Sequence, residues 1–419
     1  MQEKIIDDKI LEKMTLANVY NIFNANIFPM LNEEDIKFCK EIQKFCIELE
    51  PKVNTSEDVY EFFSELGKHG FMQRINVWKD YRPFGMKKEL LLSINLSILD
   101  AELDAARFTS SVLCANALFH YFHHGGKNEK IEKIKDELMS GEKIGSLCIT
   151  EPERGSDSVN MTTMCTKTDD SIIYNGKKVF TTNGPKADYF VIYGVYDKEK
   201  PRETMVQTLI PRELGVKTNR IAISSAPRIH IAQTFLEDVK VPQEFILADN
   251  GDGYKRLFEG LVPERLVISA NGLGVCWGAL IYGMIYTNYR RQFGKDIIKF
   301  EGVGFGLADL LSKVTAATAL ALQVGTIYDE KILFAEKPNK EVSKWTAGVV
   351  SQAKYHIARL SHEVCYEVQQ QMGGISLTDN TPLDRYSNVS KIEEVIGGAR
   401  NIQLLIIQNA LSKIKKIIE

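Results

Sequence analysis

Hydrophobic positions follow a helical period over the first third of the chain. Between residues 32 and 143 apolar side chains recur every three or four positions, as at Phe38, Ile42, Phe45 and Cys46. This spacing places them on one face of a helix. The pattern therefore predicts a helical block over this range.

Two parts of that region need separate predictions. Residues 88–122 are apolar and rich in Ala and Leu, which predicts two packed helices, and the Pro- and Gly-containing segment 80–85 predicts a break before them. Residues 1–30 show no strong pattern, and they are either a docking helix or a loose tail.

The period changes near Gly145. Residues 171–174 and 177–180 flank Asn175-Gly176, which predicts a β-hairpin because Asn-Gly suits a type I′ turn. Three further stretches predict strands: 189–196, 205–210 and 232–236. We therefore expect a β block from residue 145 to about 247.

Helical periodicity returns after a predicted loop at Gly251–Gly253. Three long stretches could each be a helix of a bundle: 254–291, 303–334 and 341–372. Helix, then strand, then helix is the predicted order of architecture.

Composition narrows the classes of protein. The 52 basic and 55 acidic residues give a formal charge of −3, which argues against a nucleic-acid binder that uses a broad basic surface. The seven cysteines are odd in number and form no CxxC pair, so they fit free thiols in a reducing compartment and a cytoplasmic location. Apolar runs such as 90–92 stop short of the ~20 residues that cross a bilayer, and we predict no membrane span. The N-terminus is unlike a signal peptide.

The HYFHH segment superficially suggests a metal site. His120 shares a helical face with His123 or His124, but no third ligand is identifiable in the sequence. We therefore predict no metal.

Two loop segments carry candidate binding chemistry. Residues 147–157 supply hydroxyls, backbone amides and a Gly-containing turn, which can hydrogen-bond a flat heteroaromatic ring or a phosphate. Residues 180–184 place an aromatic ring and two hydroxyls at a predicted strand end, which suits stacking and hydrogen bonding. Read alone, the first is equally a solvated turn and the second more often core plus turn.

Glycine-containing segments follow in the last third of the chain, at residues 290–295, 370–374 and 396–403. Glycines beside helices permit close approach of a ligand to the backbone, although Gly-Gly also simply ends helices.

Taken together and in this order, these segments resemble the acyl-CoA dehydrogenase family from about residue 32 to the C-terminus. The resemblance is carried by ITEPERGSD (149–157), NGKKVFTTNG (175–184), VPQEFIL followed by GDGY (241–254), RRQFGKDIIKF (290–300) and QQQMGG followed by IGGARNIQ (369–403).

The resemblance implies an α+β fold and FAD as cofactor. The implied domains are a leader (1–30), an N-terminal helical domain (31–144), a middle β-sandwich or barrel domain (145–250) and a C-terminal four-helix bundle (251–419). The implied cofactor-binding residues are Leu147, Ile149, Thr150, Ser156, Phe180, Thr181, Thr182, Arg290, Gln292, Phe293, Gln370, Gly373, Gly374, Ala399 and Asn401. Those from residue 290 to 374 match positions that reach the flavin of a neighbouring subunit, which implies a homotetramer or homodimer.

The implied reaction is α,β-dehydrogenation of an acyl thioester to the trans-2-enoyl thioester. A carboxylate removes the α-proton while flavin N5 accepts hydride, and hydrogen bonds acidify that proton at the thioester carbonyl. The implied substrate-binding residues are Ser156, Arg265, Gly397 and Gly398, with the amide of Gly397 as a donor to the carbonyl.

The catalytic base departs from the commonest family pattern. Gly397 stands where a glutamate is usual, and a glycine cannot take a proton. Isovaleryl- and long-chain-type members carry the glutamate just before an arginine on the first long C-terminal helix, which Glu264-Arg265 matches. Because Pro263 cannot donate a backbone hydrogen bond, the helix should start or bend there. Glu264 is the predicted base, against the alternative of a solvated helix-face glutamate.

Other departures leave the substrate and the reaction open. Val262, Glu301, Ala399 and the Glu153-Arg154 pair replace usual family residues, so the acyl group is tethered either to CoA or to an acyl carrier protein. The expected electron acceptor is an electron-transfer flavoprotein or a similar protein. The alternatives are a flavin oxidase or monooxygenase on the same fold, or a non-catalytic family member.

Overall fold

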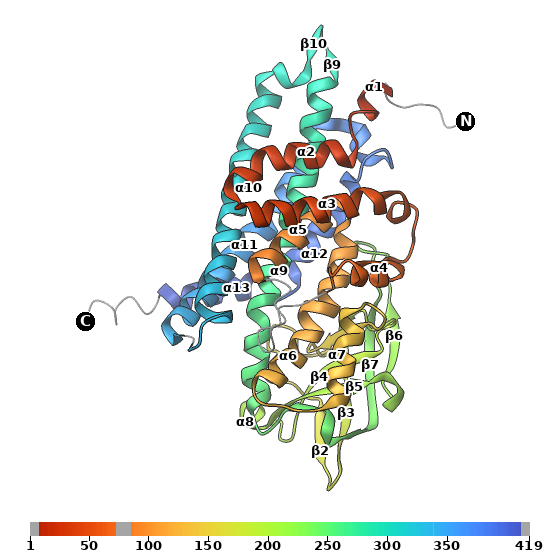
Figure 1. Cartoon of the computed structure of the whole chain (residues 1–419), viewed down its shortest axis with the longest axis vertical. Helices are drawn as coiled ribbons and strands as arrows, with labels where there is room; N and C mark the ends of the chain where they lie inside the picture. The colour runs from red at the N-terminus through yellow and green to blue at the C-terminus, as the bar shows by residue number, and fades with distance from the viewer. Residues whose placement is uncertain (1–7, 73–84, 338, 412–419) are drawn as a thin grey trace, which may run out of the picture. The chain divides into compact units, whose positions relative to one another are not determined.

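A computed structural model describes residues 8–72, 85–337 and 339–411 (Figure 1). The chain divides into two compact units. Unit 1 consists of Met1–Ser56, Met86–Asp104 and Arg265–Glu419, and unit 2 of Glu57–Gly85 and Ala105–Glu264. The sequence analysis predicts four contiguous domains, whereas each of these two units is made of separate segments of the chain. The predicted domain limits stay predictions.

Unit 1 is helical, and two long helices, α5 and α9, each pass from one unit into the other. Its elements are α1 (Asp8–Leu11), α2 (Leu16–Ile27), η1 (Phe28–Met30), α3 (Glu33–Val53), the first part of α5 (Met86–Phe108), the second part of α9 (Asp252–Tyr289), β9 (Arg291–Gln292), β10 (Lys295–Asp296), η6 (Ile297–Lys299), α10 (Glu301–Tyr328), η7 (Asp329–Leu333), α11 (Lys340–Met372), η8 (Gly373–Leu377), α12 (Leu383–Val395) and α13 (Arg400–Leu411).

The leader contains a packed helix. In α2, Val19, Tyr20 and Phe23 are buried, and the hydroxyl of Thr15 caps the helix by accepting a hydrogen bond from the amide of Asn18. The ring of Phe23 meets Trp277 edge to face at 5.6 Å. Of the two readings left open for this segment, the docking helix is the one that the structure shows.

Close packing around α9 builds the helical bundle of unit 1. The indole of Trp277 donates to the hydroxyl of Thr318 in α10 at 2.9 Å. A Cβ at Gly278 would clash with Tyr386 of α12, and one at Gly283 would lie 2.7 Å from Val368 of α11. Since α9 lies directly against these three helices, the predicted bundle is confirmed.

Unit 2 contains a mixed sheet of eight strands with short helices. Its elements are η2 (Val59–Phe62), α4 (Phe63–Lys68), the end of α5, η3 (Thr109–Cys114), α6 (Ala115–His123), α7 (Glu129–Met139), β1 (Gly145–Cys148), β2 (Met164–Lys167), β3 (Ser171–Thr182), β4 (Tyr189–Val195), α8 (Pro201–Thr204), β5 (Met205–Pro211), η4 (Arg212–Leu214), β6 (Lys217–Ile221), β7 (Ile231–Pro242), η5 (Gln243–Phe245), β8 (Ile246–Ala248) and the start of α9.

The sheet has the strand order β6-β7-β3-β2-β4-β5-β8, and β1 pairs with β4. The β1–β4 and β2–β4 pairs are parallel and the others are antiparallel. The predicted β block and the α+β class are therefore confirmed.

The predicted hairpin at Asn175-Gly176 is wrong. Both residues lie inside β3, which runs unbroken from Ser171 to Thr182, and the register against β7 shifts between Tyr174 and Gly176. The side chain of Asn175 donates to the carboxylate of Asp238 on β7 and accepts from its amide, both at 2.9 Å. This pairing with a distant strand satisfies Asn175 within the sheet, so a β-bulge replaces the turn.

Helix α9 also corrects the sequence reading. It begins at Asp252, inside the predicted loop and well before Pro263, so Pro263 does not start the helix. The predicted break at 80–85 lies outside the described residues except for Gly85, which is the N-cap of α5.

Two stretches are long and apolar enough to cross a membrane, judged by length and composition: Asp252–Tyr289 and Glu301–Leu333. The short runs considered in the sequence analysis missed them. The most apolar window of the first is wholly buried in protein, as in the core helix of a soluble protein, and that of the second is 39% buried. The absence of a membrane span stays a prediction.

Candidate active site

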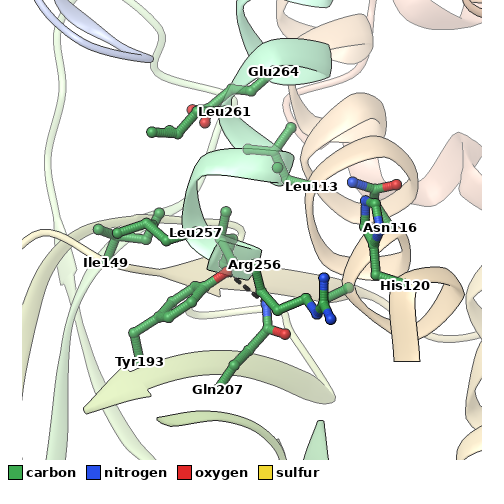
Figure 2. Close-up of a pocket in the computed structure, with 13 residues that line it drawn as sticks. Leu113, Asn116, His120, Ile149, Tyr193, Gln207, Arg256, Leu257, Leu261 and Glu264 are labelled. Atoms are coloured by element: carbon green, nitrogen blue, oxygen red, sulfur yellow. Dashed lines mark hydrogen bonds between the residues drawn. The ribbon is translucent and has the colours of Figure 1, made fainter. Parts of the chain in front are cut away.

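A pocket in unit 2 collects residues from η3, α6, the β1 strand and its end, β4, β5 and the start of α9 (Figure 2). Its free volume is about 10 Å³, close to the space that one water molecule needs. The apolar walls are Leu113, Ala117, Leu147, Ile149, Leu257 and Leu261.

Glu264 supplies the carboxylate of this pocket. Among the described lining residues it is the only acid, and it shares the pocket with Leu147 and Ile149, two residues expected to contact the flavin. Burial raises the pKa of the Tyr193 phenol, and the charges of Glu264 and Glu259 raise it further. The charge of Glu264 is thus felt by another residue of the pocket, and the pocket that its carboxylate lines is mainly apolar.

Several polar side chains line the same pocket, and sequence reasoning singled out only His120 among them, as a candidate metal ligand. Asn116 and His120 come from α6, and Arg256 comes from α9. Tyr193 and Gln207 are direct cross-strand partners on β4 and β5, and the Gln207 amide donates to the Tyr193 hydroxyl at 2.6 Å. Sequence analysis could have found Tyr193 and Gln207 by predicting the register of the β4–β5 pair, which places the two residues opposite each other.

The histidine segment does acquire a third candidate ligand, contrary to the sequence reading. Ligand atoms of His120, His124 and Glu259 lie within 4.8 Å of one another. However, Glu259 is ion-paired with Arg256, and burial lowers the pKa of His124. The guanidinium of Arg256 already pairs with the Glu259 carboxylate, which would have to ligate the metal ion. We therefore assign no metal here.

The loop after β1 is anchored by a buried ion pair that the sequence analysis did not single out. Glu151 is 2% exposed and lies 2.9 Å from the ammonium of Lys178 on β3. It also accepts from the amides and hydroxyls of Thr162 and Thr163 at 2.5–2.9 Å. Burial alone would raise the pKa of Glu151, but these donors outweigh it and hold that pKa at about 2.

This anchoring brings together two of the segments predicted to bind FAD. The amide of Val179 donates to the carbonyl of Thr150 at 2.9 Å, and the hydroxyl of Ser146 donates to the carbonyl of Thr182 at 2.6 Å. The 147–150 and 179–182 stretches therefore lie side by side in unit 2.

Phe180 stands out on this edge of the sheet. Its φ is +55°, which is a strained conformation for a bulky side chain, and its ring is 61% exposed. Ser156 is exposed, Thr150 and Thr182 are half-buried, and Thr181 is buried with its hydroxyl 3.1 Å from that of Thr234. An exposed ring near the hydroxyls of Thr150, Ser156 and Thr182 suits a flat heteroaromatic group.

In unit 1, Gly397 and Gly398 form a turn with positive φ values of +61° and +90°. Three buried side chains hold its carbonyl oxygens. Arg265 and Gln403 donate to the Gly397 oxygen at 3.3 and 3.2 Å, and Lys354 and Gln403 donate to the Gly398 oxygen at 2.9 and 2.7 Å. The predicted residues Arg265, Gly397 and Gly398 are thus brought together.

The remaining predicted residues of unit 1 lie near the ends of its helices. Most are exposed, namely Gln292, Phe293, Gln370, Gly373, Gly374 and Asn401, whereas Arg290 and Ala399 are half-buried. Phe293 is 91% exposed at the tip of the β9–β10 hairpin, with a φ of +49°. Exposed residues of this kind are available to a ligand or a neighbouring subunit, and their cofactor role stays a prediction.

Comparison with known proteins gives consistent matches. The family model described as acyl-CoA dehydrogenase, middle domain, matches residues 146–239, and the one described as acyl-CoA dehydrogenase, C-terminal domain, matches residues 251–412.

Curated relatives match over most of the chain. A short-chain specific acyl-CoA dehydrogenase from Megasphaera elsdenii is 28% identical over 71% of this chain and 75% of its own length. Subunit CarC of the caffeyl-CoA reductase-Etf complex from Acetobacterium woodii is 27% identical over 69% of this chain and 73% of its own.

Solved structures agree with these relatives. The butyryl-CoA dehydrogenase structure from Megasphaera elsdenii superposes with a TM-score of 0.81 at 26% identity, over 91% of this chain and 98% of that one.

Proposed function

On the premise that this chain belongs to the acyl-CoA dehydrogenase family, we propose that it is a flavin oxidoreductase that dehydrogenates an acyl thioester between Cα and Cβ. The observation that carries the proposal is the pocket of unit 2, in which Glu264 is placed among apolar walls. The recurrent acyl-CoA dehydrogenases among the relatives support an acyl-CoA substrate in general.

FAD, when bound, would supply the acceptor for the hydride that leaves Cβ. The 147–156 loop and Phe180–Thr182 would hold its ring system, since the exposed Phe180 side chain and the hydroxyls of Thr150 and Ser156 suit stacking and hydrogen bonding to a heteroaromatic ring. The Glu151–Lys178 ion pair fixes this loop to β3 before any ligand binds. We propose the matching positions of unit 1 from Arg290 to Gly374 as contacts to the cofactor of a neighbouring subunit, and Ala399 and Asn401 as a further stretch near the flavin.

Glu264 acts as the general base in this proposal. Its carboxylate takes the α-proton, and the apolar side chains of Leu147, Ile149 and Leu261 exclude water from the reacting carbon. The ordinary alternative, a solvated glutamate on a helix face, is disfavoured by the position of Glu264 in the pocket wall.

The Gly397–Gly398 turn acts on the thioester carbonyl. Its carbonyl oxygens are engaged by Arg265, Lys354 and Gln403. Within the described part of the chain, the amides of Gly397 and Gly398 donate no hydrogen bond to another residue. The amide of Gly397 is therefore available to the carbonyl oxygen, where it stabilises the charge that develops as the α-proton leaves.

The finer features of the reaction partners are proposals as well. We propose CoA as the tether, with an acyl carrier protein as the alternative, because Val262 departs from the usual family residue at a position that bears on the contacts to the carrier. A flavoprotein acceptor is supported by the Etf complex named for the Acetobacterium relative. A homotetramer or homodimer would complete the cofactor site with residues of a second copy.

Replacement of the base tests the proposal. In the FAD-loaded enzyme mixed anaerobically with a panel of acyl-CoA thioesters, Glu264→Gln is expected to slow flavin bleaching by about 10²–10⁴-fold, because the amide cannot take the proton. Glu237→Gln, an exposed glutamate on β7, is the matched control and is expected to react like the wild type. Full-rate reduction by Glu264→Gln would show that another group is the base.

A further inference from the structure

The pocket in unit 2 has a polar end away from Glu264. Figure 2 shows Glu264 at the top of the pocket and Tyr193 and Gln207 at the bottom, with Arg256 beside them. Arg256 and Glu264 are eight residues apart on α9, so about 12 Å of helix rise separates their backbone positions. A pocket lined only for an unsubstituted aliphatic chain would not need hydrogen-bonding groups at this depth.

Gln207 is the key residue of this polar end. It is 2% exposed, and its amide nitrogen donates to the Tyr193 hydroxyl at 2.6 Å. Its amide oxygen is buried and, within the described residues, accepts no hydrogen bond. A buried acceptor without a donor is costly, so this oxygen is suited to a ligand that brings a hydrogen-bond donor into the pocket.

The charges around the polar end select against an ionised ligand group. Arg256 is already ion-paired with Glu259, and Glu264 adds a further negative charge to the pocket. A carboxylate at this end would meet the lone pairs of the Gln207 amide oxygen, and the guanidinium of Arg256 that could offset its charge is already engaged by Glu259. An ammonium group would meet the guanidinium of Arg256. A neutral donor is the group that fits both the charge and the hydrogen bonding.

We propose that the acyl group carries a neutral hydroxyl towards its far end, which donates to the amide oxygen of Gln207. The free volume of the whole pocket is about 10 Å³, so a hydroxyl is a neutral donor that needs little additional space beside Gln207. A longer chain enters only as the leucine side chains of the walls turn aside. This inference rests on the proposed dehydrogenation and specifies its substrate class.

The test is a binding series on the FAD-loaded wild-type enzyme. CoA thioesters of increasing chain length are made in three matched forms, ending in a hydroxyl, in a methyl group of equal heavy-atom number, or in a carboxylate. Dissociation constants are measured by calorimetry, and flavin bleaching is followed in parallel. At one chain length the hydroxyl form is expected to bind at least about tenfold more tightly than the methyl form.

Variants assign the preference to one atom. Gln207→Met keeps the length of the side chain but removes the acceptor, and it is expected to reduce the hydroxyl-to-methyl ratio to about one. Gln233→Met, at an exposed position on β7, is the matched control and should leave the ratio unchanged. If Gln207→Met fails to fold, the series on the wild-type enzyme still decides the question.

The outcomes separate the two proposals. Equal or tighter binding of the methyl form at every length would show that an ordered water alone satisfies Gln207, and it would overturn the inference; so would a preference for the carboxylate. Flavin bleaching without a hydroxyl preference leaves the dehydrogenase and removes this substrate class. A hydroxyl preference that depends on Gln207, without bleaching by any thioester, supports the hydroxyl site and contradicts dehydrogenation.

Discussion

Each of the two units buries a lysine beneath a loop of the candidate site, and each lysine is close to a glutamate. In unit 2, Lys178 is fully buried and contacts Glu151 at 2.9 Å. In unit 1, Lys354 is 1% exposed and donates at 2.9 Å to the carbonyl of Gly398, while its charge acts on the buried Glu393. The two glutamates nevertheless have opposite protonation behaviour.

The charge of the directly contacting Lys178, together with the number of hydrogen-bond donors, explains this difference. Burial raises the pKa of both carboxyls, but Glu151 receives donors from Lys178, Thr162 and Thr163, and its pKa falls to about 2. Glu393 receives one hydrogen bond, from Ser361 at 2.8 Å, and its pKa rises to about 8. A buried acid is therefore a structural anion in unit 2 and holds a proton at neutral pH in unit 1.

The largest expected effect comes from breaking the ion pair of unit 2. Lys178→Met should lower the free energy of unfolding by about 3–5 kcal/mol, because Glu151 is left buried without its counter-ion. Chemical denaturation at pH 7 measures the change. The adjacent, exposed Lys177→Met is the control and should change the stability by less than about 1 kcal/mol.

The pH dependence of Lys178→Met sharpens this test. The native pKa of Glu151 lies below its ordinary value of 4.5, so its stabilisation is complete above pH 4.5 and is lost as the pH falls towards about 2. The variant should show a shallower loss of stability over this window. A change of less than about 1 kcal/mol at pH 7 would contradict the importance of the ion pair.

The next effect concerns Glu393 and has the opposite sign. Its native pKa lies above its unfolded value of 4.5, so stability falls as the pH rises from 4.5 to about 8 and then levels off. Glu393→Gln removes this penalty and should stabilise the protein by about 3 kcal/mol at pH 7, with little effect near pH 4.5.

Thermal and denaturant unfolding of Glu393→Gln at several pH values measures this dependence. Glu367→Gln, at an exposed position on α11, serves as the control. Equal stabilisation of Glu393→Gln at pH 4.5 and pH 8 would show that Glu393 is already ionised in the native state.

The smallest of the three effects is on the Gly397–Gly398 turn. Lys354→Met removes one charged donor from the Gly398 carbonyl and should lower kcat for flavin reduction by about 10- to 100-fold. Lys354 is a positioning residue, so a partial rescue by Lys354→Arg is expected. Lys340→Met, at an exposed position at the start of α11, is the control.

Separate values of kcat and KM decide the role of Lys354. A loss of thermal stability with an unchanged kcat at a permissive temperature would show that Lys354 supports the fold but does not position the turn.

Local pattern predicted the elements best where one helix or strand is long and its period is clear. The stretches 341–372 and 189–196 were predicted to within a residue of α11 and β4. The prediction failed at Asn175-Gly176, because local turn preference was overridden by hydrogen bonds to Asp238, some 60 residues away in the chain.

The sequence by itself determined the order of helical and β regions and the family, and it predicted the segments that face the cofactor, because these depend on period and on short motifs. Only the tertiary structure decided what surrounds Glu264. The side chains of Asn116, Gln207 and Arg256 come from separate elements, and strand pairing and helix packing alone bring them to one pocket. Hydrogen-bond satisfaction and the protonation of buried acids depend on such neighbours, and no local stretch of sequence contains them.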